Sequence, residues 1–237
     1  NPIKKEKKEI TEKIIEPSII KKDLILKNEI KNKAIKENSL IDIGNFTITP
    51  KLTYSRLKTD NYVSGKVSVV DEKDVVIPEI AFSYNNHTLK AETLSLKTYF
   101  YGVIIGENDL AMKNSWFKLN YLYKYENANI GLAYNQYKVK GNFTFENSIY
   151  YVDNEQKFPS LELHLENEED RIKVEYGLSY GKNSDIDYAY EYYLNLGYKI
   201  FSNDNLIVSA GYKNKTIEIE NIRFQHKGPT ISLGGTF

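Results

Sequence analysis

The sequence contains no cysteine among its 237 residues, so disulfide bonds, thiol nucleophiles and thiolate metal sites are all excluded. Net charge is also absent, because 32 basic residues balance 32 acidic ones, and no overall field steers the protein toward nucleic acid. No stretch approaches the roughly 20 consecutive apolar residues that a transmembrane helix needs. The chain opens at Asn1 without the apolar core of a signal peptide, so an exported protein with this start would be a mature form.

The first part of the chain is rich in lysine, glutamate and isoleucine. Residues 3–37 hold no aromatic residue and no glycine, and isoleucine and leucine recur there with a loose helical period. Pro17 should divide this run into a short helix and a longer one. We therefore predict a polar, partly helical or mobile segment at residues 1–42, either periplasmic or inserted into a barrel lumen.

From residue 43 to residue 237 the apolar period changes to two, which predicts β-strands. The alternation is clearest over residues 172–180 and 186–200, and turn-forming clusters such as 71–74 and 153–156 separate the runs. Residues 216–227 are interpreted as the arms of a long last loop. We predict about twelve strands, with ten or fourteen as alternatives, at residues 44–57, 62–71, 75–85, 88–104, 112–125, 129–140, 142–152, 159–167, 171–182, 186–200, 205–215 and 229–237.

Three features favour a membrane barrel over a soluble lipocalin-like barrel or sandwich. Many of the 20 tyrosines lie toward the ends of the apolar faces, as interfacial girdles do. The polar faces mix glycine, alanine and serine with isolated charges, as a packed polar lumen requires. The runs of about 9–15 residues exceed a typical soluble strand and match a tilted membrane span. The expected fold class is all-β: a closed antiparallel transmembrane β-barrel.

The end of the chain carries a more specific pattern. Ile231, Leu233 and the terminal Phe237 lie on one face of the last predicted strand. With this ending and its alternating strands, the chain from about residue 44 resembles bacterial outer-membrane β-barrel proteins, in which such a terminus is a membrane assembly signal. Gly235 departs from that pattern at one apolar position. The resemblance implies the outer membrane as location, with its lipid, lipopolysaccharide and assembly machinery as partners.

Within that class the sequence is broadly similar to small monomeric porins of about twelve strands that pass acidic oligosaccharides. Their lumens are rich in arginine, whereas this chain has only Arg56, Arg171 and Arg223. The resemblance therefore implies small hydrophilic solutes without implying selectivity for acidic sugars.

Charged side chains on the polar faces are candidates for lining the lumen. A charge that faced lipid would cost about 2–4 kcal/mol at the membrane midplane, so this face must be wet or paired. The candidates are Lys51, Lys66, Glu79, Lys97, Lys118, Lys124, Glu146, Glu162, His164, Lys173, Glu175, Asp187, Glu191, Lys199 and Lys213.

Catalytic signatures are missing from the sequence. Three histidines occur, His87, His164 and His226, and His164 shares its face with two glutamates. We interpret His164 as a residue of the lumen wall, the alternative being a metal or proton site. No nucleophile elbow, zinc-protease motif or phosphate-binding loop is present. The motifs of outer-membrane phospholipases and proteases cannot be mapped either, so we expect no enzyme, no metal and no cofactor.

The main functional hypothesis is a porin-like channel for passive diffusion of small hydrophilic solutes. Twelve strands would enclose a bore between the filled interior of eight strands and the open channel of sixteen. The alternatives are a translocator-type barrel with a helix in its lumen and a closed structural or adhesive surface barrel.

Overall fold

The computed structural model describes residues 46–63, 66–100, 110–145, 148–201 and 206–237. The segment predicted at residues 1–42 lies outside the described residues. No helix among the described residues has the length and apolarity needed to cross a membrane.

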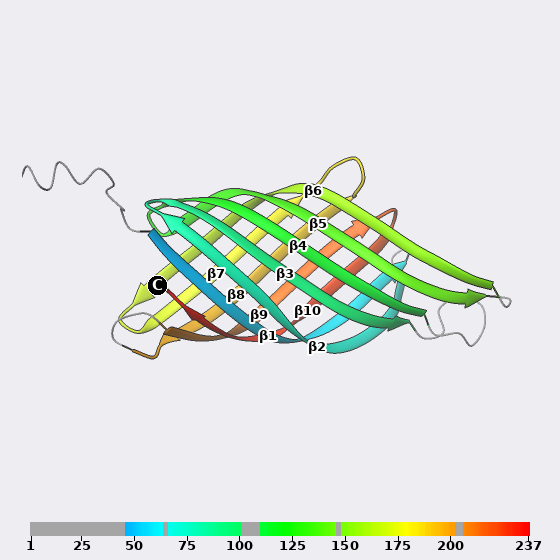
Figure 1. The fold of residues 1–237 in the computed structure, drawn as a ribbon, viewed down its shortest axis with the longest axis horizontal. Helices are drawn as coiled ribbons and strands as arrows, with labels where there is room; N and C mark the ends of the chain where they lie inside the picture. Colours follow the sequence, from blue (N-terminus) through cyan, green and yellow to red (C-terminus); the bar gives the residue numbers. More distant parts are fainter. Residues whose placement is uncertain (1–45, 64–65, 101–109, 146–147, 202–205) are drawn as a thin grey trace, which may run out of the picture. The chain divides into compact units, whose positions relative to one another are not determined.

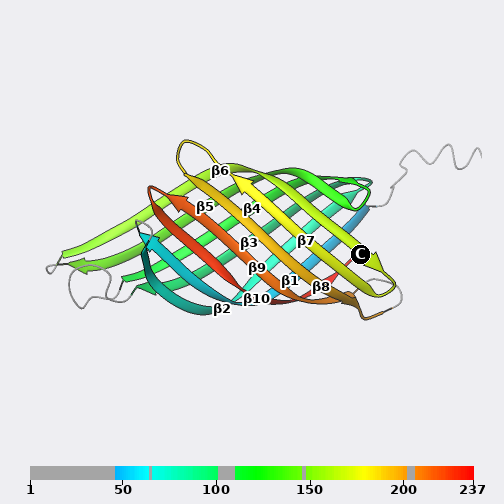
Figure 2. The same ribbon diagram turned by 180° about the vertical axis from the view of Figure 1, so that it is seen from behind.

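Ten antiparallel strands form one closed barrel (Figures 1 and 2). Each strand pairs with its neighbours in sequence, and β1 pairs with β10 to close the wall. The strands are β1 (Phe46–Val63), β2 (Lys66–Tyr84), β3 (His87–Phe100), β4 (Leu110–Tyr125), β5 (Ala128–Phe145), β6 (Ser148–Glu169), β7 (Ile172–Gly181), β8 (Tyr188–Lys199), β9 (Leu206–Ile219) and β10 (Ile222–Gly235).

The closed antiparallel barrel was predicted, but the count of twelve strands was wrong. Residues 71–74 continue β2 without a break, and residues 153–156 continue β6. Their acidic and basic side chains are compatible with a strand because several face outward and pair there, as Lys140 does with Asp153 at 2.9 Å. Turn-forming composition therefore gave false breaks, and long strands were divided into shorter ones.

The predicted loop at residues 216–227 is also wrong, because β9 and β10 run through it as a hairpin. Glu220 and Asn221 form its two-residue turn, and both have positive φ, 50° and 66°. This is the backbone of a type I′ turn, whose twist suits a hairpin and which asparagine tolerates well. Two-residue turns also join β2 to β3, β4 to β5 and β6 to β7.

The two ends of the barrel can be distinguished by these connections. Phe237 exchanges backbone hydrogen bonds with Ile48, and Phe46 pairs with Tyr84, so the beginning of β1, the chain end and the turn at 85–86 share one end. We call this the proximal end and the opposite one the distal end. The longest strand, β6, pairs with β7 only from Ser160 onward, so its first residues extend beyond β7 at the distal end (Figure 1).

Side chains alternate between the inside and the outside of the wall along every strand. One interior position requires glycine: a Cβ at Gly177 would lie 2.1 Å from the Tyr193 ring. The missing side chain lets Tyr193, on the adjacent strand, lie across the interior, where it meets the charged residues described below.

Candidate functional site

An apolar belt surrounds the proximal part of the barrel. Every strand contributes large apolar or aromatic side chains that point outward and are exposed. A contiguous apolar surface of this extent requires an apolar surrounding medium. The belt contains Leu52, Tyr54, Val76, Ile80, Phe82, Leu89, Phe117, Tyr121, Ile130, Leu132, Tyr134, Leu161, Leu165, Val174, Leu178, Tyr180, Tyr192, Leu194, Leu196, Tyr198, Val208, Tyr212, Ile231 and Leu233.

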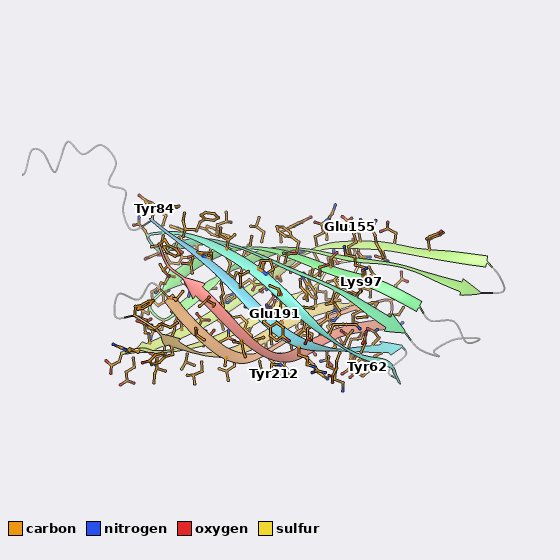
Figure 3. The ribbon with its side chains drawn as sticks, turned by 60° about the horizontal axis from the view of Figure 1, so that its bottom comes forward. Tyr62, Tyr84, Lys97, Glu155, Glu191 and Tyr212 are labelled. Carbon is orange, nitrogen blue, oxygen red and sulfur yellow. The ribbon has the colours of Figure 1, made fainter. Side chains whose placement is uncertain are left out.

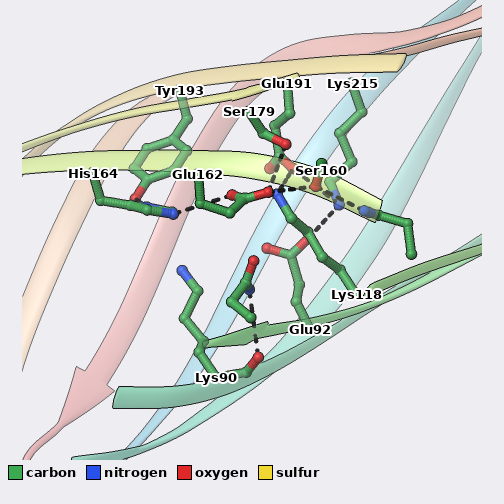
Figure 4. A network of polar contacts seen from close by, with 12 residues as sticks. Lys90, Glu92, Lys118, Ser160, Glu162, His164, Ser179, Glu191, Tyr193 and Lys215 are labelled. Carbon is green, nitrogen blue, oxygen red and sulfur yellow. Dashed lines mark hydrogen bonds and ion pairs between the residues drawn. The ribbon is translucent and has the colours of Figure 1, made fainter. Parts of the chain in front are cut away.

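Inside the belt the barrel is filled with paired charges, and Lys118 on β4 is central among them (Figure 4). Its Nζ lies 2.8 Å from Glu162 Oε2 and 2.9 Å from Glu191 Oε2. Ser160 and Ser179 each donate a hydrogen bond of 2.7 Å to Glu162 Oε1. Both oxygens of this buried carboxylate therefore have partners, as a charge removed from water requires.

Two more lysines continue this cluster across the barrel. Lys213 Nζ lies 3.0 Å from Glu191 Oε1 and 2.5 Å from Glu92 Oε2. Lys215 Nζ lies 2.7 Å from Glu92 Oε1 and 3.4 Å from Glu191 Oε2. Three lysines thus face three glutamates, and the cluster has no net charge. Because it connects β3, β4, β6, β8 and β9, it ties opposite walls together.

A second group of ion pairs lies closer to the proximal end. The Glu175 carboxylate lies 3.2 Å from Lys51 Nζ and 3.0 Å from Lys173 Nζ. The Glu166 carboxylate lies 3.0 Å from both Lys173 Nζ and Lys124 Nζ. A separate pair, Lys90 with Glu79 at 3.3 Å, lies beside the central cluster.

His164 connects the central charged cluster to Tyr193. One ring nitrogen, Nε2, lies 3.3 Å from Glu162 Oε2, and the other, Nδ1, lies 2.6 Å from the Tyr193 hydroxyl. Both nitrogens are therefore engaged by the barrel's own side chains. The described residues contain no group of three or more histidine, aspartate or glutamate side chains placed to hold a metal ion.

The interior changes character toward the distal end. There the inward side chains are apolar and closely packed: the Trp116 ring contacts those of Tyr137 and Phe158 edge-to-face, at centroid distances of 5.4 and 5.9 Å. This apolar layer consists of Leu57, Val75, Ile77, Leu94, Leu96, Met112, Trp116, Tyr137, Val139, Phe158, Ile186, Ala189, Ile217, Ile219 and Phe224.

Buried asparagines join the apolar layer to the charged cluster. Trp116 Nε1 donates to Asn135 Oδ1 at 3.0 Å, and Asn135 Nδ2 donates to Ser160 Oγ at 2.8 Å. Lys215 Nζ also lies 4.9 Å from the centre of the Trp116 ring, a cation–π distance. The side-chain polar atoms of Trp116 and Asn135 are thus satisfied within the protein.

The polarity of the outward side chains also changes between the proximal and the distal part. Beyond the belt many of them are charged, and Figure 3 labels two of these, Lys97 and Glu155. Others are Arg56, Asp74, Lys113, Lys138, Arg223 and Lys227. The distal part of the barrel therefore has an apolar interior and a charged exterior, the opposite of the proximal part.

Two groups of surface contacts stabilise this distal exterior. Glu155 accepts hydrogen bonds from Lys157, Lys138 and Gln136, which lower its pKa to about 2. Glu218 accepts one from Tyr188 at 2.5 Å and another from Arg223 at 2.8 Å. Burial and the bond to Glu218 raise the pKa of Tyr188 to about 12, and the same bond lowers the pKa of Glu218.

The structure places the predicted lumen residues in several environments. Nine face the proximal interior: Lys51, Glu79, Lys118, Glu162, His164, Lys173, Glu175, Glu191 and Lys213. Lys124 and Lys199 lie near the proximal opening, where they pair with Glu166 and Glu168. Asp187 is exposed ahead of β8, next to the distal turn, where its carboxylate accepts the Asn221 N–H at 3.4 Å.

The prediction for Lys97 was wrong, because its side chain points outward and is exposed (Figure 3). The side chain of Lys66 and all of Glu146 lie outside the described parts of the chain. On β3 the inward residues are Lys90 and Glu92 together with Leu94 and Leu96, so a single face is charged at one end and apolar at the other. The sequence pattern was taken to give each strand a single polar face along its whole length. Lys97 was therefore assigned to the lumen, although it lies on the outward face of β3.

Lys90, Glu92, Lys215 and Tyr193 are the main interior residues that sequence reasoning missed. Lys90 and Glu92 do alternate with Leu89 and Ala91, so the local signal was present. The signal that could have selected them is register, since Glu92 lies opposite both Glu79 and Lys118 once β3 is paired. The register of β3 against β2 and β4 is set when the barrel closes, so it cannot be read from β3 alone.

No protein-family model matches the sequence, and a sequence comparison with characterised proteins finds no match. The fold, however, is similar to solved structures. The outer membrane protease OmpT from Escherichia coli is 12% identical, with a TM-score of 0.52 over 84% of this chain and 99% of that one. Ail of Yersinia pestis is 9% identical, with a TM-score of 0.43 over 80% and 99% of the two chains.

A third similar structure is the translocator domain of the autotransporter NalP from Neisseria meningitidis, 9% identical, with a TM-score of 0.39 over 91% and 98% of the two chains. The likeness to OmpT shows a shared fold and nothing further at this identity. Together with the apolar belt, it defines the class: the protein has the fold of a small bacterial outer-membrane β-barrel.

Proposed function

We propose that this protein is a closed outer-membrane barrel that displays its distal part outside the cell as a binding surface. The proximal belt spans the lipid, and the distal strands continue beyond it as a water-soluble extension. The two-residue proximal turns that join β2 to β3, β4 to β5 and β6 to β7, and the extension of β6 beyond β7 at the distal end, support this orientation, since bacterial barrels have short periplasmic turns.

The observation that carries the proposal is the filled interior. Lys118, Glu162 and Glu191 are 4%, 2% and 6% exposed, and Tyr137 and Ile217 in the apolar layer are 1% and 0% exposed. A cavity bounded by Lys51, Glu79, Lys90 and Tyr193 has a volume of about 30 Å³. That is room for one or two water molecules and too little for a sugar.

A porin-like channel, the main hypothesis from the sequence, has less support from this geometry. A diffusion pore needs a continuous aqueous path, and here both a charge-paired layer and an apolar layer lie across it. The prediction assumed a bore of twelve strands, and ten strands enclose a narrower one. The polar interior that suggested solutes is used instead to join opposite walls.

Planar-bilayer recording of the purified, folded full chain tests the closed barrel. We expect no stable unitary current from the wild-type protein. A variant in which Trp116, Tyr137 and Phe158 of the apolar layer and Lys118 and Glu191 of the charged layer are all replaced by alanine should conduct, because it opens both layers. Should that variant fail to fold, the triple variant Trp116→Ala, Lys118→Ala and Glu191→Ala opens both layers with fewer changes. Unitary currents from the wild-type protein would overturn the proposal in favour of a channel.

Single cysteines test the orientation, since the chain has none of its own. Tyr151→Cys on the exposed part of β6 should react with a membrane-impermeant maleimide on intact cells. Asn86→Cys, in a proximal turn, should react only after the outer membrane is permeabilised. The reverse pattern of labelling would refute the orientation.

The proposed function also implies contacts with membrane components and no catalytic role. We propose that the belt contacts outer-membrane lipid, that outward lysines beyond it, such as Lys113 and Lys157, meet the phosphates of lipopolysaccharide, and that Ile231, Leu233 and Phe237 serve assembly. We propose no catalytic activity, because His226 is buried and its Nδ1 already contacts Thr59 Oγ1 at 3.0 Å.

A further inference from the structure

Three lysines form a continuous row across the outer face of the distal wall. Lys97 on β3 lies directly opposite Lys113 on β4, and Lys113 lies directly opposite Lys140 on β5. All three side chains point outward and are exposed, and Lys97 is labelled in Figure 3. Like charges in directly opposite register are unfavourable unless anions share their surroundings. We call these three residues the lysine row.

The described residues around the lysine row supply fewer carboxylates than lysines. Asp153 on β6 lies opposite Lys140 and pairs with it at 2.9 Å, at one end of the row. Within the described parts of the chain, neither Lys97 nor Lys113 has a carboxylate within ion-pair distance. Asp74 on β2 borders the same pocket as Lys97 without pairing with it. Two of the three ammonium groups are therefore left to solvent or to a ligand.

The two rows nearer the belt add positive charge to the same face. Lys138 lies 3.8 Å from Asp153 and 3.1 Å from Glu155, and Lys157 lies 3.0 Å from Glu155. The distal outer face of β3 to β6 thus carries five described lysines against two carboxylates. With Asp74 included, the excess is still two positive charges. Such an excess on one face attracts anions, although the whole chain has no net charge.

The sheet beneath the lysine row is regular and is backed by the apolar layer. Leu96, Met112 and Val139 adjoin the three lysines in sequence and are buried in that layer. The backbone of the row is therefore fixed before a ligand binds, and only the side chains remain to be ordered. Neighbouring strands lie about 4.8 Å apart, so the three lysines start from positions at regular intervals of about that length.

The lysine row lies beyond the edge of the belt. Phe117 is an outward residue of the belt on β4, and Lys113 lies four residues farther toward the distal end, or about 13 Å of strand. Lys157 lies level with Phe117 instead, because both are in register with Gln136. The row is therefore displayed farther from the lipid than Lys157, where a soluble ligand can reach it.

We propose that the lysine row binds a linear acidic polysaccharide. A sugar ring in an extended chain is about as long as the spacing between neighbouring strands, so successive rings can place their anionic groups on successive lysines. Ser95 and Ser115 lie opposite each other in the next row and supply hydroxyl groups for those of the sugars. A protein partner would need an apolar or aromatic centre to its contact, and the row offers none.

This inference rests on the proposed function for its setting, because the row faces the outside only if the distal part is displayed. The binding itself is a property of the folded barrel and can be measured in an uncharged detergent. Currents from the wild-type protein or a reversed labelling pattern would overturn the proposed function and leave the binding result untouched. Absence of binding would leave the conductance and labelling results untouched.

Binding of short dextran sulfate to the folded full chain tests the site. The protein is kept free of lipopolysaccharide, because the phosphates of that lipid would compete for Lys113. We expect dextran sulfate to bind and to be released as salt is added, while neutral dextran of the same length does not bind. No binding at low ionic strength would overturn the proposal. Equal binding of linear polyphosphate with the same charge would also overturn it, because the sugar would then contribute nothing.

Charge-matched variants distinguish the row from the net charge of the protein. The row variant, Lys97→Gln, Lys113→Gln and Lys140→Gln, should bind dextran sulfate at least about tenfold more weakly than the wild type. The control removes the same charge from the distal outer face of β1 and β10 and should bind within about twofold of the wild type. It consists of Arg56→Gln, Lys58→Gln and Arg223→Gln. Equal weakening by the two variants would overturn the proposal, and gel mobility of unheated samples checks that both fold.

Two further measurements locate the contact on the row itself. Asp153→Asn removes the carboxylate beside Lys140 and should strengthen binding about twofold or more. Acylation of lysines by a water-soluble reagent, read by mass spectrometry, should slow at the three lysines of the row when dextran sulfate is bound and stay unchanged at Lys58. Unchanged or weaker binding by Asp153→Asn, or protection of Lys58 as strong as that of the row, would place the contact elsewhere and overturn the proposal.

Discussion

The proximal and distal parts of this barrel have opposite polarity, although every described strand except β7 contributes to both parts. In the proximal part, Leu132 and Leu161 point outward while Lys118 and Glu162 point inward. In the distal part of the same strands, Lys138 and Glu155 point outward and Trp116 and Phe158 point inward. Neither the strand direction nor the side-chain alternation changes between them.

The surrounding medium, lipid or water, therefore decides which face of the wall must be apolar. Lipid accepts leucine and tyrosine and excludes charge, so in the proximal part the charges turn inward and pair. Water accepts charge, so in the distal part the apolar residues turn inward and pack as they do in a soluble protein. On β4 the change lies between Trp116 and Phe117. Trp116 is the last inward residue of the apolar layer, and Phe117 is the first outward residue of the belt.

Removing an aromatic ring from the distal layer should have the largest effect on stability. Trp116→Ala deletes a buried side chain and its hydrogen bond to Asn135, and we expect a loss of about 3–5 kcal/mol. Phe117→Ala, the outward neighbour, should lose only roughly 1 kcal/mol, because deleting an outward side chain leaves no cavity in the interior. Denaturant unfolding in lipid vesicles, followed by gel mobility of unheated samples, measures both. Equal losses would contradict an apolar layer inside the distal part.

Breaking the proximal charge cluster should be nearly as costly. Lys118→Met leaves Glu162 and Glu191 short of a cation, and we expect a loss of about 3 kcal/mol. The loss stays at the low end for buried pairs because Lys213 and Lys215 still face Glu191. The control is Lys140→Met, whose partner Asp153 is exposed, and it should change stability by about 0–1 kcal/mol. The same unfolding assay applies, and two equal values would mean that the interior is well hydrated.

A charge placed on the outer face separates lipid from water directly. Leu161→Arg puts a cation into the belt and should cost about 2–3 kcal/mol. Gln136→Arg, outward on β5 in the distal part, should stay within about 0.5 kcal/mol, because water and Glu155 surround it. If both variants folded and unfolded like the wild type in vesicles, the belt would not be in contact with lipid.

The smallest effect concerns pH at the distal surface. Hydrogen bonds from Lys157, Lys138 and Gln136 hold the pKa of Glu155 at about 2 instead of 4.5. Because the folded pKa is the lower one, the stabilisation is complete above pH 4.5 and is lost as the pH falls toward about 2. Glu155→Gln should therefore speed local backbone exchange near residues 136–138 and 155–157 at pH 7 and make much less difference at pH 2, where the carboxyl of Glu155 is about half protonated. A difference that persists in full at pH 2 would assign the effect to packing instead.

Part of the fold could be read from local pattern alone. The period of two predicted strands through residues 172–180, which lie in β7, and 186–200, which contain β8, and the wall is closed and antiparallel as expected. The number of strands could not be read in this way. Residues 71–74 and 153–156 have the composition of turns but lie in strands, because their charges meet water and partners outside the belt.

The interior shows the same division between local and non-local information. Lys118, Glu162 and Glu191 were selected because each alternates with apolar neighbours in its own strand. Their meeting depends on pairing between β4, β6 and β8, strands separated by tens of residues, and so does the contact of Lys215 with Trp116. Lys97 was placed wrongly because the apolar residues of β3 change faces along the strand.

By itself, the sequence determined that the chain from the first strand onward forms strands with two chemically distinct faces, because alternation is a local property of the extended backbone. Only the tertiary structure decided which face is inside at each level, how many strands close the wall, and that glutamates and lysines from five strands neutralise one another across it. These outcomes depend on register and on the surrounding medium, and neither is encoded within a single strand.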